Sequence, residues 1–321
     1  MAEPMVPYVK LPTFEEYSEM FKDYFDLKRE DGILQVTMKT GDKPMHWSGG
    51  AHRAMSQLSR MISLDHDNEI IIWTHKGDNW MQDYDYDGWQ RYSDERFQHQ
   101  YFDDMNLIKN MIFDLDVPTI GAIPGPGFHW DSAILCDITV AAPDCTFEDP
   151  HLDLGMVSGD GMGMLLQHLI GTKKASYLMY LGGQINAQTA CEWGLISEVA
   201  PKGQVVERAW EIARIIKEAP YEARTITSYL AKRPLEKLIA SDMKMNSFAE
   251  MFSTMCQINK GSLGNDDDEQ VDEKYMTPYW SWRCADASND ELQKPRKLDQ
   301  FKNARKTAKK WFDETYPNAK Y

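Results

Sequence analysis

The sequence predicts an α/β protein with a mainly parallel sheet, followed by a helical region. Two observations support this class. Strand-like apolar runs alternate with runs of helical spacing over the first 200 residues, and after Pro201 the pattern is almost purely helical. Strands that alternate with helices are typical of βαβ units. The length of 321 residues fits one large α/β domain with an appendage, or two domains.

In the first half of the chain, each expected element has its own local signal. Residues 14–21 (FEEYSEMF) have a helical pattern, and Asp31-Gly32 is a turn signal before residues 33–39 (ILQVTMK), which alternate as a strand does. Residues 69–74 (EIIIWT) form the continuous apolar run that a buried parallel strand needs. The same patterns predict helices at 51–64 and 105–115 and strands at 119–123 and 135–142.

In the second half, glycines separate short helices from one another. We expect these helices at residues 162–170, 174–181 and 187–193, and longer ones at 205–217, 221–231 and 235 to about 257. Residues 265–273 (NDDDEQVDE) hold six acidic side chains and indicate a boundary or an exposed loop. The segment beyond it is aromatic and then basic, and we expect it to dock on the protein because its aromatic side chains need a surface.

The net charge of the chain and the spacing of its cysteines indicate which kinds of partner and which cellular compartment to expect. The chain has 50 acidic and 35 basic residues, so its net charge of −15 argues against nucleic-acid and anionic-membrane binding. The five cysteines are widely spaced and include no Cys-x-x-Cys pair, which indicates reduced thiols. Neither a secretory signal nor an apolar stretch of membrane-spanning length is present in the sequence, so we expect a cytoplasmic protein.

Most of the chemical signal lies in residues 118–163. A strand leads into Pro-Gly-Pro-Gly and a short helix that opens at Phe128-His129-Trp130, where backbone N–H groups can hold a developing oxyanion. His151 and Asp160 lie nine positions apart with glycines between them. A glycine-bent loop can fold Asp160 onto the imidazole, which orients the ring and makes its other nitrogen a better base. The alternative role for Asp160 is to cap the helix that follows it.

The order of motifs resembles the crotonase (enoyl-CoA hydratase/isomerase) superfamily from about residue 14 to residue 257. The resemblance rests on the series strand, GPG, short helix, CDI, strand, PHLDLG and GDG, and on the later segment GGQINAQTACEWGLISEV. It implies an α/β fold with a spiral core of ββα repeats, a helical trimerisation region, and trimers or dimers of trimers. We accordingly expect a crotonase-like core at 1–200, a helical oligomerisation region at 201–260, and an acidic linker with a C-terminal extension at 261–321.

Within the superfamily, the chain resembles the β-diketone hydrolase branch of 6-oxocamphor hydrolase. The two glutamates of the hydratases are matched here by Asp131 and His151, so the hydratase pair is absent. The branch has a tryptophan and a histidine matched by Trp47 and His52 in HWSGGAH, and a histidine after the Gly-Pro turn, matched by His129. Its further histidine, aspartate and glutamate are matched by His151, Asp160 and Glu250.

The resemblance implies a retro-Claisen hydrolysis, the cleavage of a C–C bond between two carbonyls, with no cofactor and no metal. Asp160 would orient His151, which deprotonates water, while His129 and Trp47 would bind the other carbonyl. The expected catalytic residues are thus His151, Asp160 and His129. The expected substrate-binding residues are Trp47, Phe128, Asp131, Trp80 and Glu250. The expected partners are a small ketonic substrate and further copies of the same chain.

Residues 78–104 bear on the choice between substrates. They hold eight acidic side chains among many aromatic ones, and form either a solvated surface loop or a cover over the pocket. In the second case, the acids would repel the phosphates of coenzyme A, and the aromatics would enclose a neutral polycyclic substrate. Three alternatives stay open: a CoA-thioester hydratase, dehydratase or isomerase; a crotonase-like lyase or cyclase of secondary metabolism; and a non-catalytic assembly protein.

Overall fold

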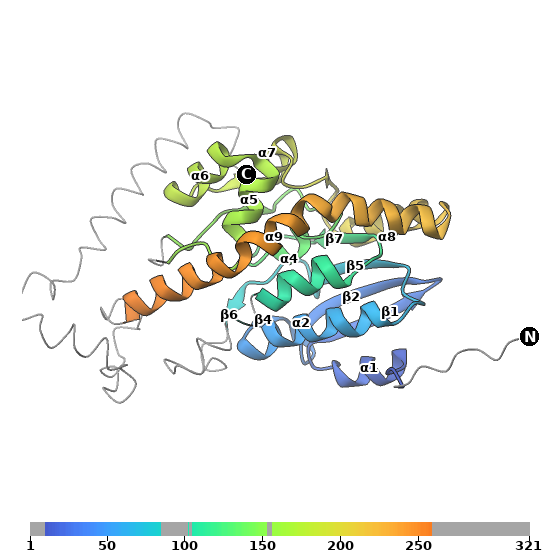
Figure 1. Cartoon of the computed structure of the whole chain (residues 1–321). Coiled ribbons are helices and arrows are strands. Elements are labelled where there is room, and N and C mark those ends of the chain that lie inside the picture. Colours follow the sequence, from blue (N-terminus) through green and yellow to red (C-terminus); the bar gives the residue numbers. More distant parts are fainter. Residues whose placement is uncertain (1–9, 85–101, 103–104, 153–155, 259–321) are drawn as a thin grey trace, which may run out of the picture.

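The computed structural model describes residues 10–84, 102, 105–152 and 156–258. Within these ranges a seven-stranded sheet forms the centre of the molecule (Figure 1). Its strands follow the order β1-β2-β5-β7-β8-β11, and β3 pairs with β2. The bounds are β1 Phe25–Glu30, β2 Ile33–Thr40, β3 Lys43–Pro44, β5 Ile70–His75, β7 Thr119–Ile123, β8 Ile138–Ala141 and β11 Glu198–Val199.

The register of the sheet confirms the mainly parallel class. The strands β2, β5, β7, β8 and β11 pair in parallel in that order, whereas β1 and β3 are antiparallel to β2. Every residue of β5 and β7 is buried, as expected of inner strands covered on both faces. The hairpin between β1 and β2 turns at Asp31 and Gly32, whose φ angles of 49° and 74° suit a tight two-residue turn.

Helices cover the sheet and carry the chain between its strands. Helices α4 and α8 pack against β5, β7 and β8, and α2 packs against η1. The bounds are α1 Phe14–Met20, α2 Gly49–Leu64, π-helical turn η1 Asn110–Asp114, α4 Asp131–Ile134, α5 Met162–Ile170, α6 Thr172–Leu181, α7 Ala187–Trp193 and α8 Val205–Lys217. Two small sheets pair β4 His46–Trp47 with β6 Asp83–Tyr84 and β9 Thr146–Phe147 with β10 Ile185–Asn186.

Helix α9, Tyr221–Ile258, crosses the molecule as one helix through Pro234, where the sequence predicts two (Figure 1). Proline removes one backbone N–H from the helix and crowds the preceding turn, but contacts of the first half with the core offset that cost. Arg224 forms an ion pair with Glu69, the residue directly before β5. The buried Lys232 donates to the carbonyls of Leu115 and Val117 at 2.8 and 3.0 Å.

Other expectations differ from the structure in detail. Strand β1 carries no clear sequence signal because alternate residues of this strand are half-exposed or charged. The strand expected from residue 135 begins at Ile138, since residues 131–134 form α4. The acidic linker, the C-terminal extension and most of the acidic aromatic segment at 78–104 lie outside the described residues. Among the helices of the described ranges, none combines the length and the apolar character that a membrane span requires.

Candidate active site

His151 occupies a turn that follows the small strand β9. In the sequence Asp149-Pro150-His151, the Asp149 Oδ1 accepts the backbone N–H of His151 at 3.1 Å and also lies 2.8 Å from its ring Nδ1. Proline in the middle of such a turn restricts φ and favours the compact form. The His151 carbonyl accepts the N–H of Met156 at 2.8 Å, which holds the other side of the residue. His151 is 7% exposed and therefore almost enclosed.

Asp160 approaches the same ring from the opposite nitrogen. Its Oδ2 lies 3.4 Å from His151 Nε2, while its Oδ1 accepts the N–H of Met162 at 2.9 Å at the start of α5. The N-cap position of α5 is Gly161, so the alternative in which Asp160 caps this helix is not confirmed. Asp160 uses one carboxylate oxygen for the Met162 N–H and the other for the imidazole. Asp160 therefore pairs with Nε2 of the ring, whereas Nδ1 is hydrogen-bonded to Asp149. Asp149 was not among the expected site residues.

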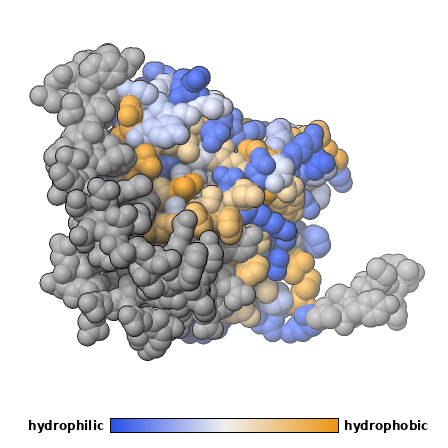
Figure 2. Space-filling view, turned by 60° about the vertical axis from the view of Figure 1, so that its left-hand side comes forward, coloured by the Kyte–Doolittle hydropathy of each residue, from blue (hydrophilic) through white to orange (hydrophobic). Residues whose placement is uncertain are grey.

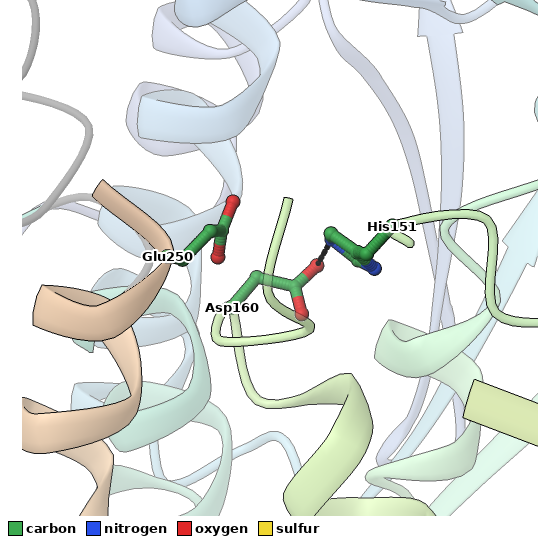
Figure 3. A group of neighbouring side chains, drawn as sticks. All are labelled: His151, Asp160 and Glu250. Atoms are coloured by element: carbon green, nitrogen blue, oxygen red, sulfur yellow. Dashed lines mark ion pairs between the residues drawn. The ribbon is translucent and has the colours of Figure 1, made fainter. Parts of the chain in front are cut away.

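Glu250 of α9 completes the cluster from a distant part of the chain. One ligand atom from each of His151, Asp160 and Glu250 can be chosen so that all lie within 4.8 Å of one another. Figure 3 shows Asp160 between the other two, with the ion pair to His151 marked. Glu250 is 3% exposed, so its side chain is enclosed with those of His151 and Asp160.

Gly159 explains how the loop before Asp160 comes so close to α9. A Cβ at this position would lie 2.2 Å from the carbonyl oxygen of Asn246 and 2.6 Å from Cβ of Glu250. No real side chain fits at such distances, and the neighbour on one side is backbone that cannot rotate away. Glycine at 159 thus permits the contact that brings the carboxylate of Asp160 beside that of Glu250.

The charges of the cluster perturb its acid–base equilibria in opposite directions. Burial alone would lower the pKa of the His151 imidazole. The charge of Asp160, hydrogen bonds to Asp149 and Asp160, and the charge of Glu250 outweigh burial and raise the pKa of this imidazole well above 6.5. Burial tends to raise the pKa of Asp160, but the His151 charge outweighs it and holds the pKa of this carboxyl well below 3.8. The two shifts both favour the charged form, imidazolium for His151 and carboxylate for Asp160.

His129 lies in a strained turn that other site residues support. Its φ of 50° is unusual for a residue with a side chain and costs of the order of 1 kcal/mol. The indole N–H of Trp80 donates to the His129 carbonyl at 3.0 Å. The ring of Trp47 packs on the imidazole with centroids 4.3 Å apart, and Asp131 Oδ1 lies 3.4 Å from Nδ1.

The expected substrate-binding residues divide by their exposure. Trp80 and Trp47 are 1% and 4% exposed, so in this state they support His129 rather than form an open wall. Asp131 is likewise buried, and the half-buried Phe128 contacts His129 edge-on. The nearby His52, which the resemblance also matched, is buried, and its ring centroid lies 4.9 Å from that of Trp47.

One backbone N–H at the opening of the short helix, that of Phe128, is already engaged and does not contribute to the expected oxyanion site. The Phe128 N–H donates to the Met81 carbonyl at 2.8 Å, and the Trp80 N–H donates to carbonyls of residues 125 and 126. Gly127 allows this close contact, since a Cβ there would lie 2.5 Å from the Met81 oxygen. The expectation fails at Phe128 because the loop at 78–81 already uses that donor. The side chain of His129, 27% exposed, is a donor that can still reach a ligand.

Among the described residues, His151, Asp160 and Glu250 have donor atoms close enough together to hold one metal ion. Two of these side chains already use the atoms concerned, however. His151 Nε2 faces Asp160, and the second oxygen of Asp160 accepts a backbone N–H. These contacts favour an acid–base cluster over a metal site.

Comparison with known sequences places the chain in a broad group of enzymes. The family model described as enoyl-CoA hydratase/isomerase matches residues 83–263, more than half of the chain. The enoyl-CoA isomerase/hydratase fer4 of Mycosarcoma maydis is 31% identical over 39% of this chain and 47% of that protein. The short-chain-enoyl-CoA hydratase of Clostridium acetobutylicum is 29% identical over 44% and 55%. The chain thus spans about half the length of the curated relatives it matches.

Solved structures match over more of the chain. A β-diketone hydrolase from the cyanobacterium Anabaena sp. PCC 7120, bound to (S)-3-oxocyclohexyl acetic acid, has a TM-score of 0.71 and 28% identity. That match covers 75% of this chain and 97% of the other. An enoyl-CoA hydratase/isomerase from Mycobacterium paratuberculosis has a TM-score of 0.67 at 22% identity, over 72% of this chain and 93% of the other, and shows the shared fold alone. With its parallel sheet, its helical C-terminal region and this family match, the chain belongs to the enoyl-CoA hydratase/isomerase family and has the crotonase fold.

Proposed function

We propose that the protein is a cofactor-independent hydrolase that cleaves a C–C bond of a cyclic β-diketone by a retro-Claisen reaction. The observation that carries the proposal is the buried cluster of His151, Asp160 and Glu250, with Asp149 on the far ring nitrogen. Such a cluster can take a proton from water and return it later. A pair of acidic side chains at the hydratase positions is absent, because His151 stands at one of them.

The reaction needs one proton to move in and out of the cluster. His151 Nε2, in its neutral form, takes a proton from water, and the hydroxide adds to one carbonyl carbon. The C–C bond to the carbon between the carbonyls then breaks, and its electron pair forms an enolate on the second carbonyl. The proton held by the cluster passes to the enolate carbon, which yields a ketone and a carboxylic acid. A positioned base of this kind contributes about 10²–10⁴-fold.

The second carbonyl needs a donor as negative charge develops on its oxygen. His129 supports this role, since Trp47 and Asp131 contact its ring and Trp80 holds its carbonyl. One such donor is worth about 10²–10³-fold in rate. The leaving group is a stabilised enolate, so base and donor together are sufficient without a metal or a cofactor.

The ligand of the Anabaena hydrolase guides the choice of substrate class. (3-Oxocyclohexyl)acetic acid is the keto acid that forms when water opens one ring of bicyclo[2.2.2]octane-2,6-dione between its two carbonyls. At 28% identity the likeness supports a cyclic diketone for this chain as well. Among the aromatic side chains near His129, the half-buried Phe128 is the one placed to contact a bulky, neutral ring system, since Trp47 and Trp80 are buried.

The second candidate function is the hydration or isomerisation of a coenzyme A thioester. The names of the curated relatives favour it. That chemistry polarises the thioester carbonyl with backbone N–H groups, but the Phe128 N–H already donates to Met81. The engaged donor argues against the thioester and for a carbonyl bound by a side chain.

A direct assay separates the candidates. We expect the full-length protein to convert bicyclo[2.2.2]octane-2,6-dione to (3-oxocyclohexyl)acetic acid, followed by NMR or chiral chromatography. His151→Ala and Asp160→Asn should each reduce kcat by about 10²-fold or more, because each removes part of the base. Activity should persist when the protein is freed of small molecules by gel filtration.

Matched controls make the result specific. His168→Ala and Asp67→Asn replace exposed side chains of the same types and should leave kcat unchanged. Full activity in His151→Ala would contradict the proposed base. Turnover of crotonyl-CoA with tight coenzyme A binding by calorimetry, and no turnover of the diketone, would establish the thioester function instead.

A further inference from the structure

Asp149 is a buried carboxylate whose side-chain hydrogen bonds, among the described residues, are with His151. Its side chain is 1% exposed, and its Oδ1 receives both the backbone N–H and the Nδ1 of His151, at 3.1 and 2.8 Å. Its Oδ2 forms no hydrogen bond with any described residue. Burying a carboxylate is costly unless a positive charge or donors compensate for the lost water. His151 therefore supplies the compensating charge for Asp149.

The chain connects the two residues by a short and restricted path. Only Pro150 separates them, and the same oxygen that binds the backbone N–H also binds the ring. Asp160, in contrast, is separated from His151 by eight residues that include two glycines. The position of the imidazole is therefore fixed mainly by Asp149, and the loop that carries Asp160 meets a ring already in place.

This arrangement distinguishes the two nitrogens of the ring. A hydrogen bond from one nitrogen to a carboxylate keeps a proton there and fixes the tautomer. Nδ1 has that partner in Asp149 at 2.8 Å, whereas the carboxylate nearest Nε2, that of Asp160, lies farther away at 3.4 Å. Nε2 is therefore the nitrogen that can gain and lose a proton. Nε2 faces Asp160 on the side where Glu250 lies (Figure 3).

We propose that Asp149 is the positioning residue of His151: it fixes the ring and keeps the proton on Nδ1, so that Nε2 exchanges its proton with water. Asp160 and Glu250 then act on the reacting side of the ring and do not orient it. The kinetic consequence rests on the proposed hydrolase function, whereas the tautomer does not. The titratable groups that face this site are Asp149 after β9, Asp160 before α5, Glu250 on α9 and His129 before α4. The charge of His129 contributes to the lowered pKa of Asp160.

The test is ¹⁵N NMR of the histidine side chains in the full-length protein, combined with kinetics. In the wild type we expect a hydrogen-bonded proton on Nδ1 of His151 throughout the titration. Asp149→Asn retains an oxygen for the backbone N–H but removes the charge, so the pKa of His151 should fall. kcat for the diketone should fall by at least about tenfold with KM changed by less than about twofold, since Asp149 does not touch the substrate.

Two comparisons make the result decisive. Asp67→Asn, at a side chain 84% exposed, should change neither the titration nor kcat. If Asp149 only stabilised its turn, Asp149→Asn would titrate at His151 as the wild type does, and that result would overturn the proposal. A wild-type ring without a proton on Nδ1 would also overturn it, even if Asp149→Asn does not fold. Failure of the wild type to hydrolyse any diketone would refute the proposed function alone, since the NMR result still decides the role of Asp149.

Discussion

The ionisation of one imidazole sets the pH range in which the site can work. The pKa of His151 lies well above 6.5 because the carboxylates of Asp160, Asp149 and Glu250 outweigh its burial. The base form of His151 is the deprotonated ring, so kcat/KM for diketone hydrolysis should rise with pH through a limb above neutral pH. Asp160→Asn removes the strongest of the charges that raise this pKa and should move the limb to lower pH.

The control for this pH profile is Asp67→Asn, which should leave the rising limb in place. A limb at or below pH 6.5 in the wild type, or one that stays in position in Asp160→Asn, would contradict the assignment.

The free energy of unfolding should also depend on pH through the pairing of His151 with Asp160. The contribution from His151 is complete below pH 6.5 and is lost as pH rises through its raised pKa. The contribution from Asp160 is complete above pH 3.8 and is lost as pH falls through its lowered pKa.

At the scale of single residues, part of the site was predictable from the sequence. The resemblance to the β-diketone hydrolases picked out His151, Asp160 and Glu250, which the structure brings together. Asp149 was missed because an acid two residues before a histidine has no distinctive spacing, although the Asp-Pro-His turn is a local signal that could have found it. The use of the Phe128 N–H was unpredictable, since it depends on a long-range contact with Met81.

Among the elements, the loop between β9 and α5 depends most on one residue. Ala in place of Gly159 would bring its Cβ within 2.2 Å of the Asn246 carbonyl oxygen. The loop must then move away from α9, which separates Asp160 from Glu250. We expect Gly159→Ala to destabilise the fold by about 1–3 kcal/mol, measured by urea denaturation, as overpacking does. kcat should fall as well, because the acid–base cluster is opened.

Gly183→Ala provides the matched control for this element. A Cβ at residue 183 would meet the Leu178 side chain at 3.6 Å, an ordinary contact, and its φ is not in the left-handed region. Its denaturation midpoint and kcat should therefore match those of the wild type. Equal stability and activity in Gly159→Ala would show that the loop does not need its close approach to α9.

Element boundaries show what sequence patterns can and cannot predict. Strand β5 was predictable because its buried residues begin with a continuous apolar run, IIIW. Strand β1 was missed because its exposed positions are charged and its alternation is weak. The break expected near Pro234 does not occur, because the tertiary contacts of Arg224 and Lys232 hold the helix on its N-terminal side. Local sequence patterns predict an element well when all of its residues are buried, as in β5. They predict it poorly when contacts with residues distant in the sequence determine where it ends, as in α9.

At the scale of the whole molecule, α9 has two faces with different demands. One face buries Met243, Ser247 and Glu250 against the core. The helix also exposes large apolar side chains to solvent, among them Ile226, Tyr229, Leu230, Met245, Phe248 and Phe252. Figure 2, which brings forward the left-hand side of Figure 1, shows hydrophobic side chains at the surface among hydrophilic ones. Exposed apolar area of this kind on a long helix favours burial against another molecule.

The expected occupant is a second copy of the chain, in a trimer or a dimer of trimers. This assembly, like the division into a core at 1–200, an oligomerisation region at 201–260 and an extension at 261–321, remains a prediction. Light scattering after gel filtration should give three or six times the mass of the monomer. The melting temperature should rise with protein concentration, because association stabilises only the folded chain.

Phe248→Glu tests which surface makes the contact. Phe248 is 58% exposed and stacks on Phe252 with ring centroids 6.3 Å apart, so a charge there would disrupt the apolar face without entering the core. We expect the variant to lose mass by light scattering and to melt at a temperature independent of concentration. Lys173→Glu, an exposed charge change on α6, should keep the wild-type mass. If Phe248→Glu assembles as the wild type does, or if the wild type is a monomer, α9 is not the oligomerisation surface.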